Sequence, residues 1–102
     1  MTKGGDIMKE QRLARYLNSV GKGCFVEYFD LFQDKLISNK DIAEQIYNEK
    51  GYTMNACISR TGHARMIIRE GGAKDALKLI IDSSRIDISK IAEARRLLQA
   101  LT

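Results

Sequence analysis

Apolar residues recur along this chain at the spacing of one face of an α-helix. The first set, at i, i+3, i+4 and i+7, consists of Leu13, Tyr16, Leu17 and Val20. It predicts a helix from near Asp6 to the residue before Gly21. No stretch shows the sustained alternation of a β-strand, and the sequence contains no proline. The pattern therefore predicts an all-α protein, a compact bundle of about five to six short helices.

An aromatic-rich segment follows the turn at Gly21-Lys22-Gly23. Its apolar side chains share one helical face, which consists of Phe25, Tyr28, Phe29, Phe32 and Leu36. We expect a second helix here, with this stripe packed in the core rather than around a ligand.

The next two helices carry capping residues. Ser38, with Asp41 three residues later, is typical of a helix start, and Gly51 is typical of a helix end. The apolar residues of this third helix are Ile42, Ala43, Ile46 and Tyr47. Thr53 is expected to cap a fourth helix that ends at Gly71-Gly72. Its apolar face consists of Met54, Cys57, Ile58, Thr61, Ala64 and Ile68.

Residues 73–102 predict two more helices. The fifth has the apolar residues Ala76, Leu77, Ile80 and Ile81. The sixth, starting near Asp87 or Ser89, has Ile88, Ile91, Ala92, Leu98 and Leu101. Residues 73–102 carry more apolar side chains than one small core can bury. We therefore expect a homodimer through the C-terminal helices, with Ile91, Leu98 and Leu101 at a two-fold interface. The alternative is that this hairpin closes the core beneath the aromatic helix.

Composition agrees with one small globular domain spanning residues 1–102. The chain is 44% hydrophobic and 29% charged, and no apolar run approaches the roughly 20 residues of a membrane span. The first residues lack the apolar core of a secretory signal, so a cytoplasmic protein is expected. Charge is unevenly distributed within the net +4: residues 24–50 carry three basic and six acidic side chains, whereas residues 51–74 carry four basic and one acidic. Such a basic block is compatible with a nucleic-acid face.

The third and fourth predicted helices are joined by the short turn Lys50-Gly51-Tyr52, and the later helix is rich in Arg, Ser, Thr and Asn. The segment from Ser38 to Gly72 resembles the helix-turn-helix superfamily of bacterial and phage DNA-binding proteins. One spacing departs from the compact motif, where the turn glycine follows a small residue by four positions, since Gly51 lies eight residues after Ala43. The resemblance implies a DNA-binding protein, such as a prokaryotic or phage transcriptional regulator, that contacts DNA through the helix near residues 53–70.

The predicted contact residues lie opposite the apolar stripe of that helix or along its edges: Thr53, Asn55, Ser59, Arg60, His63, Arg65 and Arg69. Asn can read adenine, Arg can read guanine or bind phosphate, and Ser and Thr can bind backbone oxygens. Gly62 shares this face with Met66. Gly62 has two possible consequences. Its missing side chain would let a phosphate chain approach the helix closely, or it would end the helix early, in which case the predicted contact face would not form. A continuous basic ridge from Arg12 and Arg15 to Arg60 would favour nucleic-acid binding.

No motif predicts catalysis, so we expect neither an enzyme nor a bound cofactor. The one histidine, His63, and two distant cysteines, Cys24 and Cys57, supply no usual metal pattern. Both cysteines lie among apolar neighbours, and we expect them to be buried.

Two other functions stay open. A non-enzymatic helical adaptor could bind a protein partner through an acidic face formed by Asp30, Asp34, Asp41 and Glu44. RNA binding would use the same basic residues through phosphate contacts.

Overall fold

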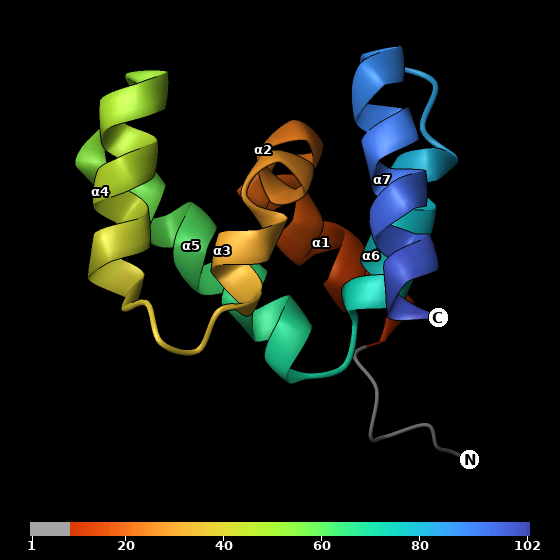
Figure 1. Cartoon of the computed structure of the whole chain (residues 1–102), viewed down its shortest axis with the longest axis horizontal. Helices are drawn as coiled ribbons and strands as arrows, with labels where there is room; N and C mark the ends of the chain where they lie inside the picture. The colour runs from red at the N-terminus through yellow and green to blue at the C-terminus, as the bar shows by residue number, and fades with distance from the viewer. Residues whose placement is uncertain (1–8) are drawn as a thin grey trace.

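Seven helices follow one another along residues 9–102, the part of the chain that the computed structural model describes (Figure 1). They are α1 (Glu10–Val20), α2 (Lys22–Glu27), α3 (Phe29–Gln33), α4 (Asn39–Lys50), α5 (Met54–Arg69), α6 (Ala73–Ile81) and α7 (Ile88–Leu101). The described residues form no strand, which confirms the all-α prediction. The expected helix start near Asp6 lies outside the described residues.

The central element is α5, which packs against α1, α4 and α3. Figure 1 shows α4 at one end of the molecule, the α6–α7 pair at the other, and α1 to α3 between them. The buried residues of α5 are Cys57, Thr61, Ala64 and Ile67. Two apolar positions differ from the prediction. Ile58 is 55% exposed, whereas Ile67, which the predicted stripe omits, is fully buried because the chain at Gly72 turns back against it.

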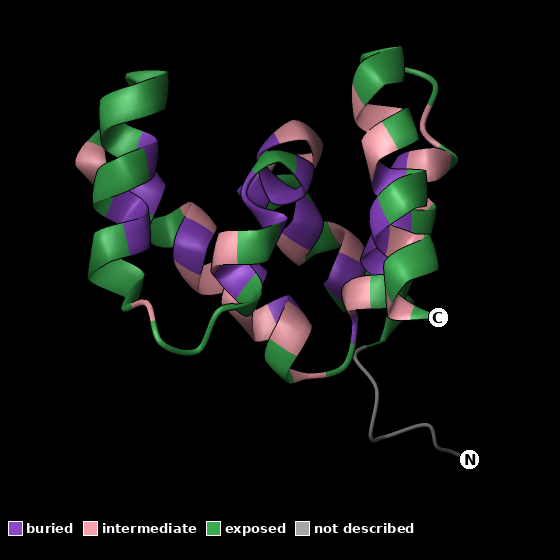
Figure 2. Ribbon diagram, in the orientation of Figure 1, coloured by how far each residue is buried: buried purple, intermediate pink, exposed green. Residues whose placement is uncertain are grey.

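The predicted single aromatic helix is two helices, broken at Tyr28. The Tyr28 backbone leaves helical geometry (φ −109°, ψ 18°), and its hydroxyl donates to Glu49 Oε1 on α4 at 2.6 Å. The aromatic residues of this segment are buried as expected, and Figure 2 shows buried positions on both α2 and α3. The prediction for Leu36 is wrong: α3 ends at Gln33, so Leu36 lies in the following loop and is 95% exposed.

The predicted caps are present. Ser38 Oγ accepts from the Asp41 amide at 3.1 Å, and Thr53 Oγ1 accepts from the Ala56 amide at 3.2 Å. Gly51 ends α4 in the left-handed conformation at φ 74°, which glycine adopts without a Cβ penalty. Helix α5 runs through Gly62 without interruption, so its outer face is continuous.

The C-terminal helices pack against each other and against α1 and α2. Helix α6 buries Ala76, Leu77 and Ile80, and α7 buries Ala94 and Leu97. The prediction that Ile88 and Ala92 belong to the apolar face of the last helix is wrong, since both are exposed at its N-terminal end, beyond the packed part of the hairpin. Among the described residues, no helix is both long enough and apolar enough to cross a membrane.

Candidate functional site

Helices α4 and α5 form the pair in which the sequence places the DNA-binding segment. They are joined by Gly51, Tyr52 and Thr53, and α5 crosses obliquely behind α4 (Figure 1). Asn39, the first residue of α4, accepts from Arg65 near the far end of α5. The two helices therefore run in roughly opposite directions and diverge toward the C-terminal end of α5 (Figure 1).

The predicted contact residue Arg60 faces inward. Its Nη1 donates to the backbone carbonyl of Val20 at 2.6 Å, and its guanidinium carbon lies 4.0 Å from the centroid of the Tyr52 ring. A Cβ built on Gly21 would lie 2.8 Å from Arg60 Nη1, so the left-handed glycine (φ 90°) also makes room for this side chain. Arg60 thus links the end of α1 to the turn before α5.

Arg65 is also engaged within the fold. Its Nε donates to the Phe32 carbonyl at 3.2 Å, and Nη2 donates to the carbonyls of Leu31 at 3.1 Å and Asp34 at 2.6 Å. Nη1 donates to Asn39 Oδ1 at 2.8 Å. Carbonyls at the end of a helix have no intrahelical donor, so Arg65 caps α3 and connects it to the start of α4.

The other predicted residues have different surroundings. The Thr53 hydroxyl is used by the α5 cap, whereas Asn55 and Ser59 are exposed on the outer face of α5. His63 is half-buried: its Nδ1 donates to the Ser59 carbonyl at 2.8 Å, and its ring packs edge-on against Tyr16 at 5.1 Å between centroids. Arg69 is exposed, with Nη2 3.8 Å from Met66 Sδ.

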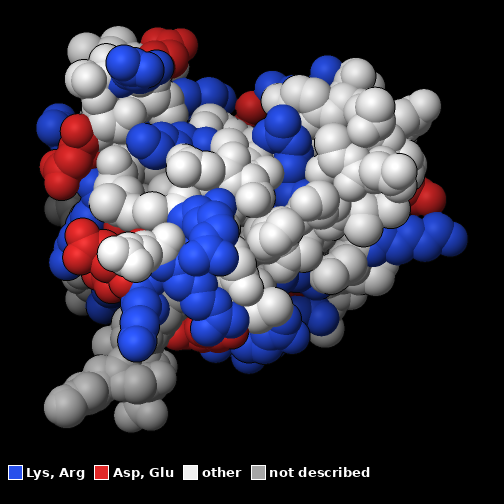
Figure 3. Space-filling model, turned by 180° about the vertical axis from the view of Figure 1, so that it is seen from behind, with Lys and Arg blue, Asp and Glu red and all other residues white. Residues whose placement is uncertain are grey.

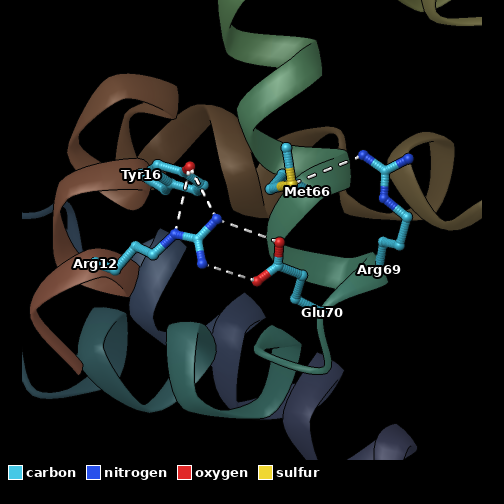
Figure 4. Close-up of polar contacts among 5 residues, drawn as sticks. All are labelled: Arg12, Tyr16, Met66, Arg69 and Glu70. Atoms are coloured by element: carbon cyan, nitrogen blue, oxygen red, sulfur yellow. Dashed lines mark hydrogen bonds and ion pairs between the residues drawn. The ribbon is translucent and has the colours of Figure 1, made fainter. Parts of the chain in front are cut away.

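Helix α1 adds side chains to the outer face of α5 that the predicted site does not include (Figure 4). Arg12 donates to the Tyr16 hydroxyl at 3.3 Å through Nη2 and forms an ion pair with Glu70 at 3.4 Å. The guanidinium also lies 5.2 Å from the Tyr16 ring centroid. The Arg12–Tyr16 spacing of i, i+4 is visible in the sequence, but their position beside α5 depends on how α1 packs.

Positive charge on this side of the molecule is interrupted. Figure 3 shows Lys and Arg in separate groups, with uncharged surface and some acidic residues between them. The Arg60 guanidinium is directed to Val20, so no continuous ridge joins Arg12 and Arg15 to Arg60. Surface cations near α5 include Arg12 on α1, Arg69 on α5 itself and Lys40 on α4, which lines a groove with residues of α5.

The cysteines and carboxylates form no reactive cluster within the described range. Burial raises the pKa of both the Cys24 and the Cys57 thiols, and the nearby Arg60 guanidinium partly opposes this shift. Among residues 9–102, no three His, Cys, Asp or Glu side chains lie together as metal ligands would.

A shallow apolar groove runs between α4 and α5. It has a volume of about 520 Å³ and is lined by Asn39, Lys40, Ala43, Glu44, Met54, Ile58 and Gly62. It adjoins the outer face of α5 but contains none of the seven predicted contact residues.

Comparison of the chain with protein families, curated proteins and solved structures gives no match.

Proposed function

We propose that this protein is a DNA-binding domain of the helix-turn-helix type. The observation that carries the proposal is the outer face of α5, where Asn55 and Ser59 are exposed on an unbroken helix whose C-terminal end lies beside Arg12 of α1. A helix that follows a short turn and presents a polar outer face is the arrangement that reads the major groove in this class of protein.

Each exposed residue has a role that fits its chemistry. Asn55 lies in the first turn of α5 and can bind adenine through two hydrogen bonds. Ser59, one turn later, can donate to a phosphate oxygen. Arg12, Arg15 and Arg69 supply the positive charge for phosphate contacts. The ion pair between Arg12 and Glu70 is partly exposed and contributes little, so Arg12 can exchange that partner for a phosphate.

Arg60 and Arg65 support this surface indirectly in the proposal. Their guanidinium groups bind backbone carbonyls of α1, α3 and the loop after α3, and so hold α5 in place. We therefore exclude both from the proposed DNA contacts, and removing either is a poor test of DNA binding because the fold itself would suffer.

The test is a titration with random-sequence duplex DNA at several salt concentrations. We expect affinity to fall steeply with salt, and Arg12→Ala or Arg69→Ala to reduce the salt slope by about one each. Asn55→Ala should instead lower the preference for an adenine-containing site selected from a random pool. Arg95→Ala, exposed on α7 at the other end of the molecule, is the matched control. Absence of binding at low salt, or a slope insensitive to Arg12 and Arg69, would refute the proposal.

A protein-interaction domain is the second candidate, and the apolar groove beside α5 favours it. The same titration separates the two, since a protein-binding domain gives no salt-dependent affinity for duplex DNA. Duplex and single-stranded RNA, included as further ligands, test the RNA-binding alternative.

A further inference from the structure

The groove between α4 and α5 leaves apolar surface in water. Ile58 lies at the edge of the groove and is 55% exposed, whereas the apolar residues on the inner side of α5 are fully buried. Ala43 and Met54 line the groove with it. Exposed apolar surface grouped around a concavity is typical of an interaction site.

Gly62 lies in the groove and is not required by the packing of this chain. A Cβ built on it meets no atom within 4 Å, and its backbone is helical. Glycine inside a helix nevertheless costs about 1 kcal/mol relative to alanine. A glycine with open space above it allows the backbone of another helix to approach closely.

The charges at the edge of the groove have opposite signs. Lys40 and Glu44 are one helical turn apart on α4, both are exposed, and neither takes part in an ion pair within residues 9–102. Ala43 lies between these two charges on α4, and it lines the groove together with Gly62 of α5.

We propose that the groove binds the groove of a second copy of this chain, forming a two-fold homodimer through α4 and α5. A two-fold axis near Ala43 and Gly62 places Lys40 of each copy opposite Glu44 of the other. The same axis brings each exposed Ile58 against the other groove and the two Gly62 backbones close together. This surface is self-complementary, as a two-fold interface must be. It carries both the protruding Ile58 and the groove that receives it, and both Lys40 and Glu44 of the charge pair. The proposal goes beyond DNA binding and does not depend on it. Because Gly62 shares one face of α5 with Asn55 and Ser59, this dimer and duplex DNA would compete for that face, and the monomer would be the DNA-binding form.

Sedimentation equilibrium of the intact chain tests this assignment. We expect a monomer–dimer equilibrium at micromolar concentrations, because the groove is small compared with large obligate interfaces. Ile58→Asp should abolish the dimer. Lys40→Glu and Glu44→Lys should each weaken it by about tenfold or more through facing like charges, and the double variant should restore it.

Two further variants separate dimerisation from folding. Gly62→Ala should raise the melting temperature of the monomer, since it adds helix propensity without a clash, while weakening the dimer. Ile88→Asp changes a residue that is 80% exposed on α7, outside the groove, and should leave the dimer intact. A monomer mass at all concentrations would overturn the proposal. So would a dimer that is lost with Ile88→Asp but kept with Ile58→Asp, which would point to the C-terminal helices, or a double charge variant that fails to restore association.

Discussion

The guanidinium of Arg60 donates a 2.6 Å hydrogen bond to the backbone carbonyl of Val20, the last residue of α1. The contact spans 40 residues of sequence and joins the central helix to the point where the chain turns at Gly21. Arg60, which the sequence predicts as a DNA contact, is therefore a structural link between α1 and α5.

Arg60→Ala is expected to destabilise the protein by about 2–4 kcal/mol, because it removes a hydrogen bond from a charged donor and the stacking on Tyr52. Urea denaturation measures the loss. Arg60→Lys should recover only part of it, since an ammonium lacks the planar group that stacks. Arg95→Ala should change stability by less than about 0.5 kcal/mol, and an equally small effect at Arg60 would contradict the structural role.

Arg65→Ala should cost about 2–3 kcal/mol, because it leaves the carbonyls at the end of α3 without their charged donor. Arg69→Ala, on the same helix but exposed, is the matched control and should be nearly neutral. Amide hydrogen exchange gives the local readout: we expect faster exchange in α3 and at the start of α4 in the Arg65 variant. Unchanged protection there would show that the capping contacts do not hold these elements.

Thr61→Val is expected to keep or raise stability, by up to about 1 kcal/mol. The Thr61 hydroxyl is completely buried on α5, and no hydrogen-bond partner for it lies within the described residues. Valine has nearly the same shape and avoids burying an unpaired polar atom. Thr61→Ser is the opposite control, since it keeps the hydroxyl and removes a methyl group, and should lower the melting temperature. A clear loss of stability in the valine variant would indicate a partner for the hydroxyl.

The stability should depend on pH through Glu27, which forms ion pairs with Lys50 at 2.7 Å and Lys90 at 3.4 Å. The hydrogen bond from Lys50, aided by Lys90, lowers the pKa of Glu27 below its ordinary value. A carboxyl with a lowered folded-state pKa stabilises the protein above its unfolded-state pKa, and this contribution is lost as the pH falls through the folded value. We expect wild type to exceed Glu27→Gln by about 0.5–1 kcal/mol at pH 7, because the pair is partly exposed.

Denaturant titrations of both proteins between neutral pH and pH 3 test this expectation. The difference between them should shrink in acid, and Lys50→Gln should reduce it at neutral pH. A difference that stays constant across the range would exclude the ion pair as its origin.

The helix ends were predictable because their causes are local. Ser38 and Thr53 each cap a backbone amide three residues later, and Gly51 adopts a left-handed turn that glycine favours. Such interactions form wherever the neighbouring residues are in place, whatever the rest of the chain does. The break at Tyr28 was not predictable in this way, because it accompanies a contact with Glu49 on another helix.

The sequence did not show which arginines hold the fold together and which lie free on the surface. Arg60, Arg65 and Arg69 all flank the predicted contact face on a helical projection, yet the first two reach carbonyl oxygens that lie 31 to 40 residues away in the chain. The exposure of Ile58 and the burial of Ile67 have the same kind of origin, since they depend on where α4 and the chain at Gly72 lie against α5.

The sequence by itself therefore determined the all-α class, the caps and most of the buried aromatic residues, because hydrophobic spacing and capping act within a few residues of one another. Only the tertiary structure decided which polar side chains remain free on the outer face of α5, where Arg12 and Tyr16 join it, and that a groove lies beside it. The physical reason is that a guanidinium or an apolar side chain is satisfied by whichever partner packing brings within reach, and those partners come from distant parts of the chain.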